Sequence, residues 1–281
     1  VYIPLRKISH ASKEFAKGNL TYEGLASFTN EDEIGNLGMS LNYMARKLNS
    51  LEEDQKKFIG NVSHDFRSPL TSIKGYVEAM KDGTIPPEMQ GKYLDIVLFE
   101  TERLTKLTKS LLTLNAWDNK SNRLDLTEFS LYEMIKPIIN SFEGKCEKKH
   151  ITIDLILGSK DYYVSADRSK IEQVIYNLLD NAIKFSHNDS SIQLDIHDKN
   201  DKIFISIKDT GIGIPKESIS KIWDRFYKTD LSRGKDKTGT GLGLSITKEI
   251  INAHDENINV ISTEGVGTEF IFTLKKVKAP K

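Results

Sequence analysis

The chain has 281 residues, which is enough for about two domains with buried cores. Lysine and arginine together number 40, as do aspartate and glutamate, so no net basic charge favours binding to nucleic acid. Cys146 is the only cysteine, which excludes an internal disulfide and a multi-cysteine metal cluster.

No stretch of the sequence approaches the roughly 18 consecutive apolar residues of a membrane span. No signal-peptide pattern opens the chain either, so we expect these residues to form a soluble protein. The sequence begins at Val1 without an initiator methionine, which suggests that the complete protein extends upstream.

The N-terminal part predicts two helices joined by an irregular connector. Residues 4–17 have the pattern of a short helix that ends at Gly18. From Ile34 to Val62, apolar residues recur at alternating spacings of three and four, the seam of a parallel coiled coil or helical bundle. A long amphipathic helix packed on its own chain is the alternative that this pattern leaves open.

The seam shifts its heptad phase beyond Val62, where the spacing steps by four before the pattern resumes at Ile73. Residues 82–87, Asp-Gly-Thr-Ile-Pro-Pro, then break the helix, and the prolines suit the start of the next one. A second helical arm follows and ends near Trp117, before the polar linker at residues 118–122. These features predict a helical hairpin.

The residues from Leu126 onward predict an α/β sandwich, in which helices cover one face of a mixed sheet. We expect helices at residues 131–149, 169–185 and 242–253, and a strand at 151–157. Two hairpins of alternating apolar residues should pair residues 192–196 with 203–207, and 258–260 with 270–274.

His64 is a candidate nucleophile. It lies two positions from Val62 and two positions from Phe66, so its side chain points away from the apolar seam. Asp65 could accept a proton from one ring nitrogen while the other nitrogen attacks an electrophile. On this local pattern alone, a solvated surface histidine is the commoner outcome. No other histidine stands at a metal-ligand spacing from His64.

Three polar residues share one side of the predicted helix at residues 169–185. Asn177 and Asn181 are four residues apart, so their amides face the same way, and Lys184 lies close to them. Amide oxygens can coordinate Mg²⁺, and an ammonium group can meet a phosphate.

Two glycine-rich segments follow. Gly211 and Gly213 come after an apolar strand and allow the backbone to approach a flat ligand, while Asp209 can accept from an exocyclic amine such as that of adenine. The second segment leads into a helix, so its backbone N–H groups can form an anion site. It consists of Gly239, Thr240, Gly241, Leu242 and Gly243. Neither segment matches a Walker loop, a Rossmann fingerprint or the protein-kinase motifs.

These four features, in this order, resemble the sensor histidine kinases of two-component signalling. Residues 1–51 are similar to a HAMP linker, 52–117 to the dimerisation and phosphoacceptor hairpin, and 126–281 to the Bergerat-type ATP-binding domain. The resemblance implies a multidomain fold, with a helical coiled coil and a dimeric four-helix bundle before an α/β sandwich with a mixed sheet.

The resemblance also implies roles for the residues around His64. His64 would accept the phosphoryl group, Asp65 would be its acid/base partner, and Arg67 and Pro69 would complete the motif. Ser68 stands where the family usually has threonine or asparagine, the residue implicated in dephosphorylating the partner regulator. Serine keeps the hydroxyl of threonine but lacks the methyl group that restricts its rotamer, so a phosphatase reaction is expected to be present but weak. A serine that only precedes Pro69 and bonds to its own backbone is the alternative.

In the ATP-binding domain, the resemblance implies that Asn177 and Asn181 hold Mg²⁺. Lys184 would bind a phosphate, and Phe185 would stack near the adenine, whose amine Asp209 would bind. Further nucleotide-binding positions would be Gly211, Gly213, Lys228 and the segment 239–243. Lys228 ends an aromatic motif at residues 223–228, and residues 229–238 would form a mobile lid.

One departure from the family pattern follows His254, where Asp255 and Glu256 replace the usual two glycines. The overall expectation is an ATP-dependent protein-histidine kinase that phosphorylates its own His64 and passes the group to an aspartate of a response regulator. It would be a homodimer and the cytoplasmic part of a membrane sensor, with its only membrane contact through an upstream segment and no nucleic-acid partner.

Two alternatives compete with this expectation. One is an ATPase of the same fold that works as a chaperone or repair machine, against which the motif around His64 argues. The other is a non-enzymatic coiled-coil scaffold with a decayed kinase domain, against which the intact asparagine and glycine motifs argue.

Overall fold

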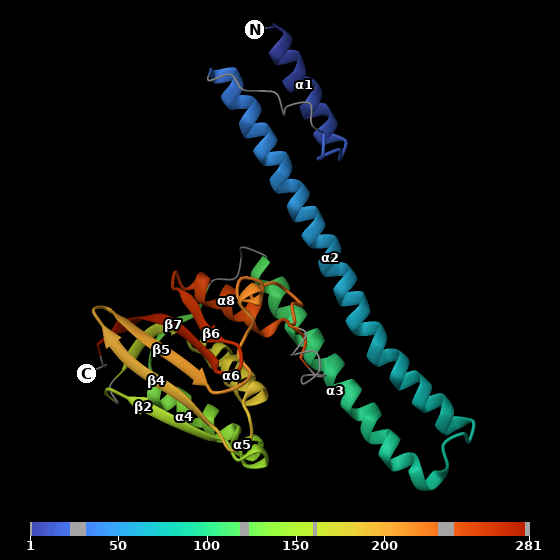
Figure 1. Cartoon of the computed structure of the whole chain (residues 1–281), viewed down its shortest axis with the longest axis vertical. Helices are drawn as coiled ribbons and strands as arrows, with labels where there is room; N and C mark the ends of the chain where they lie inside the picture. The colour runs from blue at the N-terminus through green and yellow to red at the C-terminus, as the bar shows by residue number, and fades with distance from the viewer. Residues whose placement is uncertain (1, 23–31, 119–123, 160–161, 230–238, 279–281) are drawn as a thin grey trace. The chain divides into compact units, whose positions relative to one another are not determined.

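The computed structural model describes residues 2–22, 32–118, 124–159, 162–229 and 239–278 (Figure 1). The chain divides into two compact units, residues 1–68 and 69–281. In the part of the chain that is described, no helix combines the length and the apolar character needed to cross a bilayer.

The first unit contains α1 (Tyr2–Ala16) and most of α2 (Glu33–Lys81), as expected from the sequence. The carboxylate of Asp32 accepts the backbone N–H of Gly35 at 2.8 Å, which satisfies a donor in the first turn of α2. A small core joins the two helices. It contains Ile8, Ala11, Phe15, Tyr22, Ile34 and Leu41.

α2 is a single helix of 49 residues that continues through the predicted change of phase and through Pro69. The apolar seam lies along one side of it and is half exposed in the single chain. The exposed fractions are 50% for Leu37, 51% for Met44, 53% for Leu48 and 56% for Leu51. In the described part of the chain, these four seam residues are therefore left about half uncovered.

The second unit begins within α2 and contains the predicted helical hairpin. α2 ends at Lys81, and α3 (Pro87–Asp118) begins at the second proline of the break. Ile85 is buried in the turn, and its backbone N–H donates to the carbonyl of Ala79 at 2.9 Å. The Tyr76 and Tyr93 rings pack across the hairpin with their centroids 5.2 Å apart. The helix break and the hairpin are confirmed.

The remainder of the second unit is a seven-stranded mixed sheet with the order β1-β3-β7-β5-β4-β2, and β6 pairs with β7. The strand β2 is parallel to β4, and the other pairs are antiparallel. The strands are β1 (Leu126–Ser130), β2 (Thr152–Leu157), β3 (Tyr163–Asp167), β4 (Ser191–Lys199), β5 (Lys202–Asp209), β6 (Ile258–Thr263) and β7 (Gly267–Val277).

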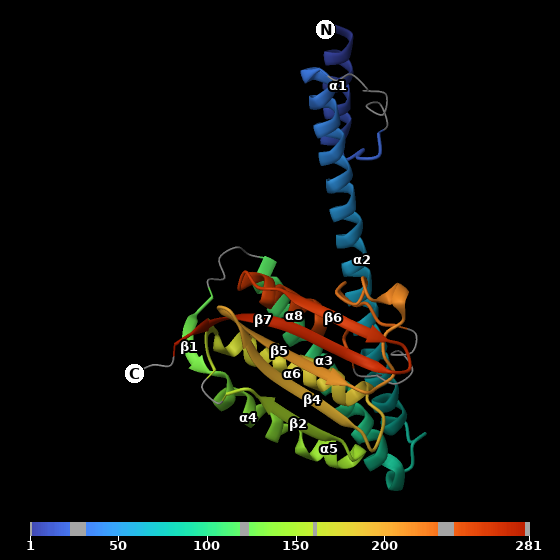
Figure 2. The same ribbon diagram turned by 60° about the vertical axis from the view of Figure 1, so that its left-hand side comes forward.

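Helices cover one face of this sheet, as Figure 2 shows for α4, α6 and α8. They are α4 (Leu131–Ser141), α5 (Glu143–Lys149), α6 (Arg168–Phe185) and α8 (Gly243–Ala253), with a short 3₁₀ helix at Lys216–Ser218. Both predicted hairpins are present: Leu194 pairs with Ile207, and Val260 pairs with Phe270. The expected α/β sandwich is confirmed.

Two details differ from the expectation. The helix predicted at residues 131–149 is two helices, because the chain bends at Phe142, whose buried ring packs against Tyr176 at 4.7 Å between centroids. The strands β1 and β3 did not stand out in the sequence. Each has five residues, too few for alternation to be distinctive, and both depend on pairing with distant segments.

The structure also shows how the chain accommodates Asp255 and Glu256. Asp255 adopts the left-handed conformation, with φ of 56°, that glycine adopts most readily. The buried Glu256 carboxylate accepts from the Lys202 ammonium at 2.7 Å and from the Thr273 hydroxyl at 2.5 Å. The turn therefore persists without glycine, and the buried charge is paired.

Candidate functional site

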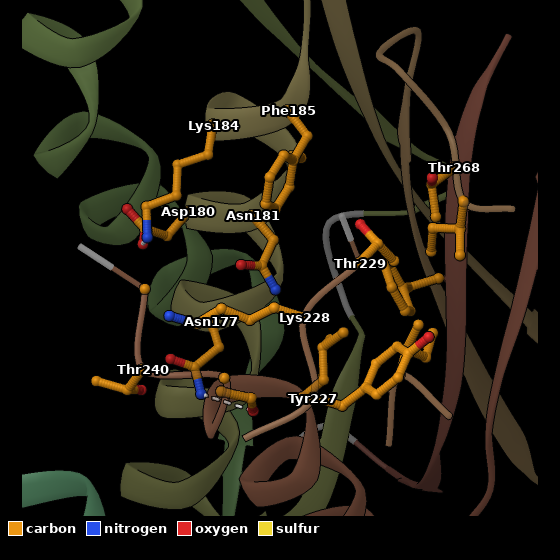
Figure 3. Close-up of a pocket in the computed structure, with 18 of the residues that line it drawn as sticks. Asn177, Asp180, Asn181, Lys184, Phe185, Tyr227, Lys228, Thr229, Thr240 and Thr268 are labelled. Atoms are coloured by element: carbon orange, nitrogen blue, oxygen red, sulfur yellow. Dashed lines mark hydrogen bonds and ion pairs between the residues drawn. The ribbon is translucent and has the colours of Figure 1, made fainter. Parts of the chain in front are cut away.

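The helix α6 presents two different faces. One is buried in the core through a continuous apolar stripe that includes Ile171, Val174, Leu178 and Ile183. The other carries Asn177, Asn181 and Lys184, and Figure 3 shows these side chains projecting from the same side of the helix. Because they follow the helical repeat, packing of the apolar stripe fixes the direction of the polar groups.

The segment after β5 lies against the C-terminal end of α6. Asp209 ends the strand and is buried, and its carboxylate accepts the backbone N–H of Gly211 at 2.8 Å. A Cβ atom at Gly211 would lie 2.4 Å from the carbonyl oxygen of Phe185, so only glycine allows this approach. Gly213 has φ of 67°, which glycine also adopts without strain.

Burial raises the pKa of Asp209, although backbone N–H groups of Gly211 and Thr268 oppose this effect. A buried carboxylate with lone pairs directed into a cavity is suited to accept from a ligand amine.

The second glycine-rich segment forms the opposite wall and leads into α8. The Asn177 side-chain amide donates to the carbonyl of Gly243 at 3.3 Å, which connects α6 to the start of α8. The backbone N–H of Phe226 donates to the carbonyl of Gly241 at 2.9 Å. The N-terminus of an eleven-residue helix, α8, therefore faces the polar side of α6.

These segments enclose one pocket, which brings together most of the residues predicted from the sequence (Figure 3). Of the predicted residues, Asn177, Asn181, Lys184, Phe185, Asp209, Gly213, Lys228, Gly239, Thr240, Gly241 and Gly243 line it. Gly211 instead packs against the backbone of Phe185, and Leu242 is fully buried in the core. Of the predicted lid, residues 230–238 lie outside the described residues.

The residues around His64 lie in the first unit, on α2. The His64 side chain is 83% exposed, and its Nδ1 lies 3.5 Å from Oδ1 of Asp65. Arg67 and Ser68 are also exposed, and Ser68 follows His64 by one helical turn. Asp65 lies beside Nδ1, which leaves Nε2 as the ring nitrogen on the other side of the ring.

No group of three or more histidine, cysteine, aspartate or glutamate side chains in the described part of the chain could hold a metal ion. The amides of Asn177 and Asn181 remain as oxygen donors within the pocket. Two amide oxygens fit Mg²⁺, because this ion keeps several waters and takes its remaining ligands from a bound phosphate.

Comparison with known proteins identifies the three segments. The family model "Histidine kinase-, DNA gyrase B-, and HSP90-like ATPase" matches residues 166–278, which contain the pocket's main walls. The model "His Kinase A (phospho-acceptor) domain" matches residues 54–120, which contain His64, and "HAMP domain" matches residues 4–50. The chain belongs to the sensor histidine kinases.

Individual relatives agree with this assignment. The chain is 35% identical over 235 residues to sensor histidine kinase WalK of Bacillus subtilis, and 37% identical over 231 residues to sensor protein kinase WalK of Staphylococcus aureus. These matches cover 83% and 80% of this chain but 38% and 54% of the two relatives. The chain thus spans about half or less of their length.

A solved structure is also similar. Histidine kinase ThkA, in complex with response regulator protein TrrA, matches with a TM-score of 0.67 and 31% identity, over 83% of this chain and 65% of that one. The fold of this chain is therefore that of a histidine kinase.

Several pocket residues were not singled out by sequence reasoning. Gln173 precedes Asn177 by one helical turn, so helical spacing could have identified it. Thr268 reaches the pocket because β7 pairs with β5 in a register that places it opposite Asp209. That pairing is a tertiary contact, and no local pattern in the sequence indicates it.

The charge of Asp209 leads to a prediction on the pH dependence of stability. Because burial raises its pKa, the folded state retains a proton that the unfolded state releases as the pH rises above about 4. The contribution of Asp209 to the free energy of unfolding of the unmodified protein (the parent) therefore falls as the pH rises from about 4 toward 7. Asp209→Asn carries no such charge and keeps an oxygen that can accept from Gly211.

We expect the free energy of unfolding of Asp209→Asn, relative to the parent, to be higher at pH 7 than at pH 4 in urea denaturation. Asp154→Asn, which changes an exposed carboxylate on β2, is the matched control. A difference between Asp209→Asn and the parent that is the same at both pH values would contradict a buried charge at this position.

Proposed function

We propose that this chain is an ATP-dependent protein-histidine kinase that phosphorylates its own His64 and passes the phosphoryl group to an aspartate of a response regulator. The observation that carries this proposal is that one chain contains both an exposed histidine beside Asp65 and a pocket lined by amide, lysine and buried carboxylate side chains. The similar ThkA structure, a complex with a response regulator, supports the second step.

The pocket offers different chemistry at its two ends. At one end, the Asp209 carboxylate would accept from the exocyclic amine of adenine, with the ring of Phe185 near the base. At the other end, the ammonium groups of Lys184 and Lys228 and the backbone N–H groups at the start of α8 would bind the phosphates. Apolar residues, including Ile212 and Phe270, also line the pocket.

Asn177 and Asn181 would hold Mg²⁺ together with phosphate oxygens of ATP. When bound, this ion neutralises negative charge on the phosphates. The bond from the Asn177 amide nitrogen to the carbonyl of Gly243 orients the amide so that its oxygen is available to the pocket.

The transfer step requires a neutral imidazole nitrogen as the nucleophile. Nε2 of His64 forms a bond to the γ-phosphorus, the bond from that phosphorus to the β,γ-bridging oxygen breaks, and ADP leaves with its electron pair. The imidazole becomes cationic during the transfer, and the Asp65 carboxylate beside Nδ1 stabilises this charge or accepts the proton. Positioning and charge neutralisation account for most of the catalysis.

Two further features belong to the proposal. Ser68, exposed one turn after His64, would orient a water against a regulator's phospho-aspartate and give a weak phosphatase reaction. The rate at which phosphorylated regulator decays with the parent and with Ser68→Ala measures this contribution.

The HAMP match at residues 4–50 supports placement of this chain on the cytoplasmic side of a membrane sensor. Fractionation of the full-length protein would test this placement.

The chain is proposed to act as a homodimer. The half-exposed seam on α2 is suited to pair with the same seam of a second copy in a parallel arrangement. Exposed apolar residues continue on both arms of the hairpin, where they include Leu70, Val77, Leu94 and Leu98.

The kinase proposal predicts that His64→Gln removes all acid-labile phosphate from the protein after incubation with labelled ATP and Mg²⁺, while nucleotide affinity is unchanged. The affinity should persist because the pocket lies on other segments of the chain. His187→Gln, which changes an exposed histidine in the second unit, is the control and should retain full labelling.

Acid-labile label on His64→Gln would show that the acceptor is another residue. Steady ATP hydrolysis by the parent without any bound phosphate would favour the ATPase alternative, and the absence of both would favour the scaffold alternative.

The dimer proposal predicts a particle of twice the chain mass at micromolar concentration in light scattering. Leu48→Glu introduces a charge into the apolar seam and should raise the dimer dissociation constant at least about tenfold. Ser50→Glu places the same charge on an exposed polar position two residues away and should have little effect. A monomeric parent under these conditions would refute the assembly.

A further inference from the structure

A buried carboxylate in the wall of the pocket pairs with three lysines from three helices. Asp180 precedes Asn181 on α6, and its side chain is only 8% exposed. Its Oδ2 lies 2.8 Å from Nζ of Lys184, and its Oδ1 lies 2.8 Å from Nζ of Lys145 on α5. Nζ of Lys106 on α3 lies 3.7 Å from Oδ2. Asp180 and Lys184 line the pocket, whereas Lys145 does not.

The charge on Asp180 is maintained by these lysines. Its buried carboxylate lies 2.8 Å from the ammonium groups of Lys184 and Lys145 and 3.7 Å from that of Lys106, so the buried negative charge is compensated. One carboxylate thus faces three ammonium groups, which leaves net positive charge at this end of the pocket. Such an excess suits an anionic ligand.

The short helix α5 holds Lys145 in place from outside the pocket. The Nζ atom of Lys145 lies 5.1 Å from the centroid of the buried Phe142 ring, at the residue before α5. One turn later, Nζ of Lys149 donates to the carbonyls of Ile183 and Lys184 at 2.7 and 2.8 Å. The two lysines therefore attach α5 to the last turns of α6.

We propose that Lys145 and Asp180 are positioning residues that set the direction and availability of the Lys184 ammonium for a nucleotide phosphate. This inference rests on the proposed function, because it takes ATP as the ligand of the pocket. Lys145 occupies one oxygen of Asp180, and the other oxygen holds Lys184 in place.

The charge that Lys145 supplies determines how strongly Asp180 retains Lys184. With Lys145 present, the carboxylate shares its charge between partners, so a phosphate can compete for Lys184. Without Lys145, the buried carboxylate depends on Lys184 and the more distant Lys106, and a phosphate must overcome a stronger ion pair between Asp180 and Lys184.

The test compares nucleotide ligands that share adenine but differ in phosphates. Lys145→Met in the full chain should weaken binding of ATP and ADP by about three- to tenfold and leave the affinity for adenosine unchanged, as measured by displacement of a fluorescent nucleotide. Lys145→Arg keeps the charge and should restore the affinity for ATP. Lys148→Met removes the same charge from an exposed position on α5 and should match the parent.

The contrasting outcomes distinguish the claims. If Lys145→Met lost affinity for ATP and adenosine equally, Lys145 would only support the structure of the domain. If Lys145→Met kept its affinity for every ligand, Lys145 would have no role in binding. Either result overturns the positioning role. A parent that binds neither ATP nor adenosine would overturn the proposed function as well. Lys145 is half exposed, so Lys145→Met is expected to fold.

Discussion

The site depends on the position and rotation of α6. Its apolar stripe is buried against the sheet, and this packing leaves Asn177, Asn181 and Lys184 on the side that faces the pocket. A rotation of one residue, 100°, would bury the amides and expose the apolar stripe, at a cost of several kcal/mol. The apolar residues of α6 that stabilise the domain therefore also orient the side chains that would bind a nucleotide.

Contacts with Lys149 and Gly211 hold the C-terminal end of α6 in place, in addition to the packing that sets its rotation. Lys149 donates to two carbonyls of its last turn, and Gly211 approaches the carbonyl of Phe185 so closely that no side chain would fit. A cation at a helix C-terminus is favourable because unpaired carbonyls accumulate there. Asp209 consequently keeps a defined position relative to Lys184.

Much of this arrangement was predictable from the sequence, because it is local. Helical spacing placed Asn177, Asn181 and Lys184 together, and alternation located the two hairpins of the sheet. The contribution of Asp180 was not predictable, since its partner Lys145 lies 35 residues away on a separate helix that the sequence pattern merged with the preceding one. The strands β1 and β3 were missed for the same reason, because they form only through distant pairing.

Hydrogen exchange with and without a non-hydrolysable ATP analogue and Mg²⁺ tests the central claim, that nucleotide binding is organised around α6. The account predicts slower exchange in the second half of α6, in residues 209–214 and in residues 239–247, with little change in β2. Protection absent from α6, or centred on segments outside the pocket, would contradict it.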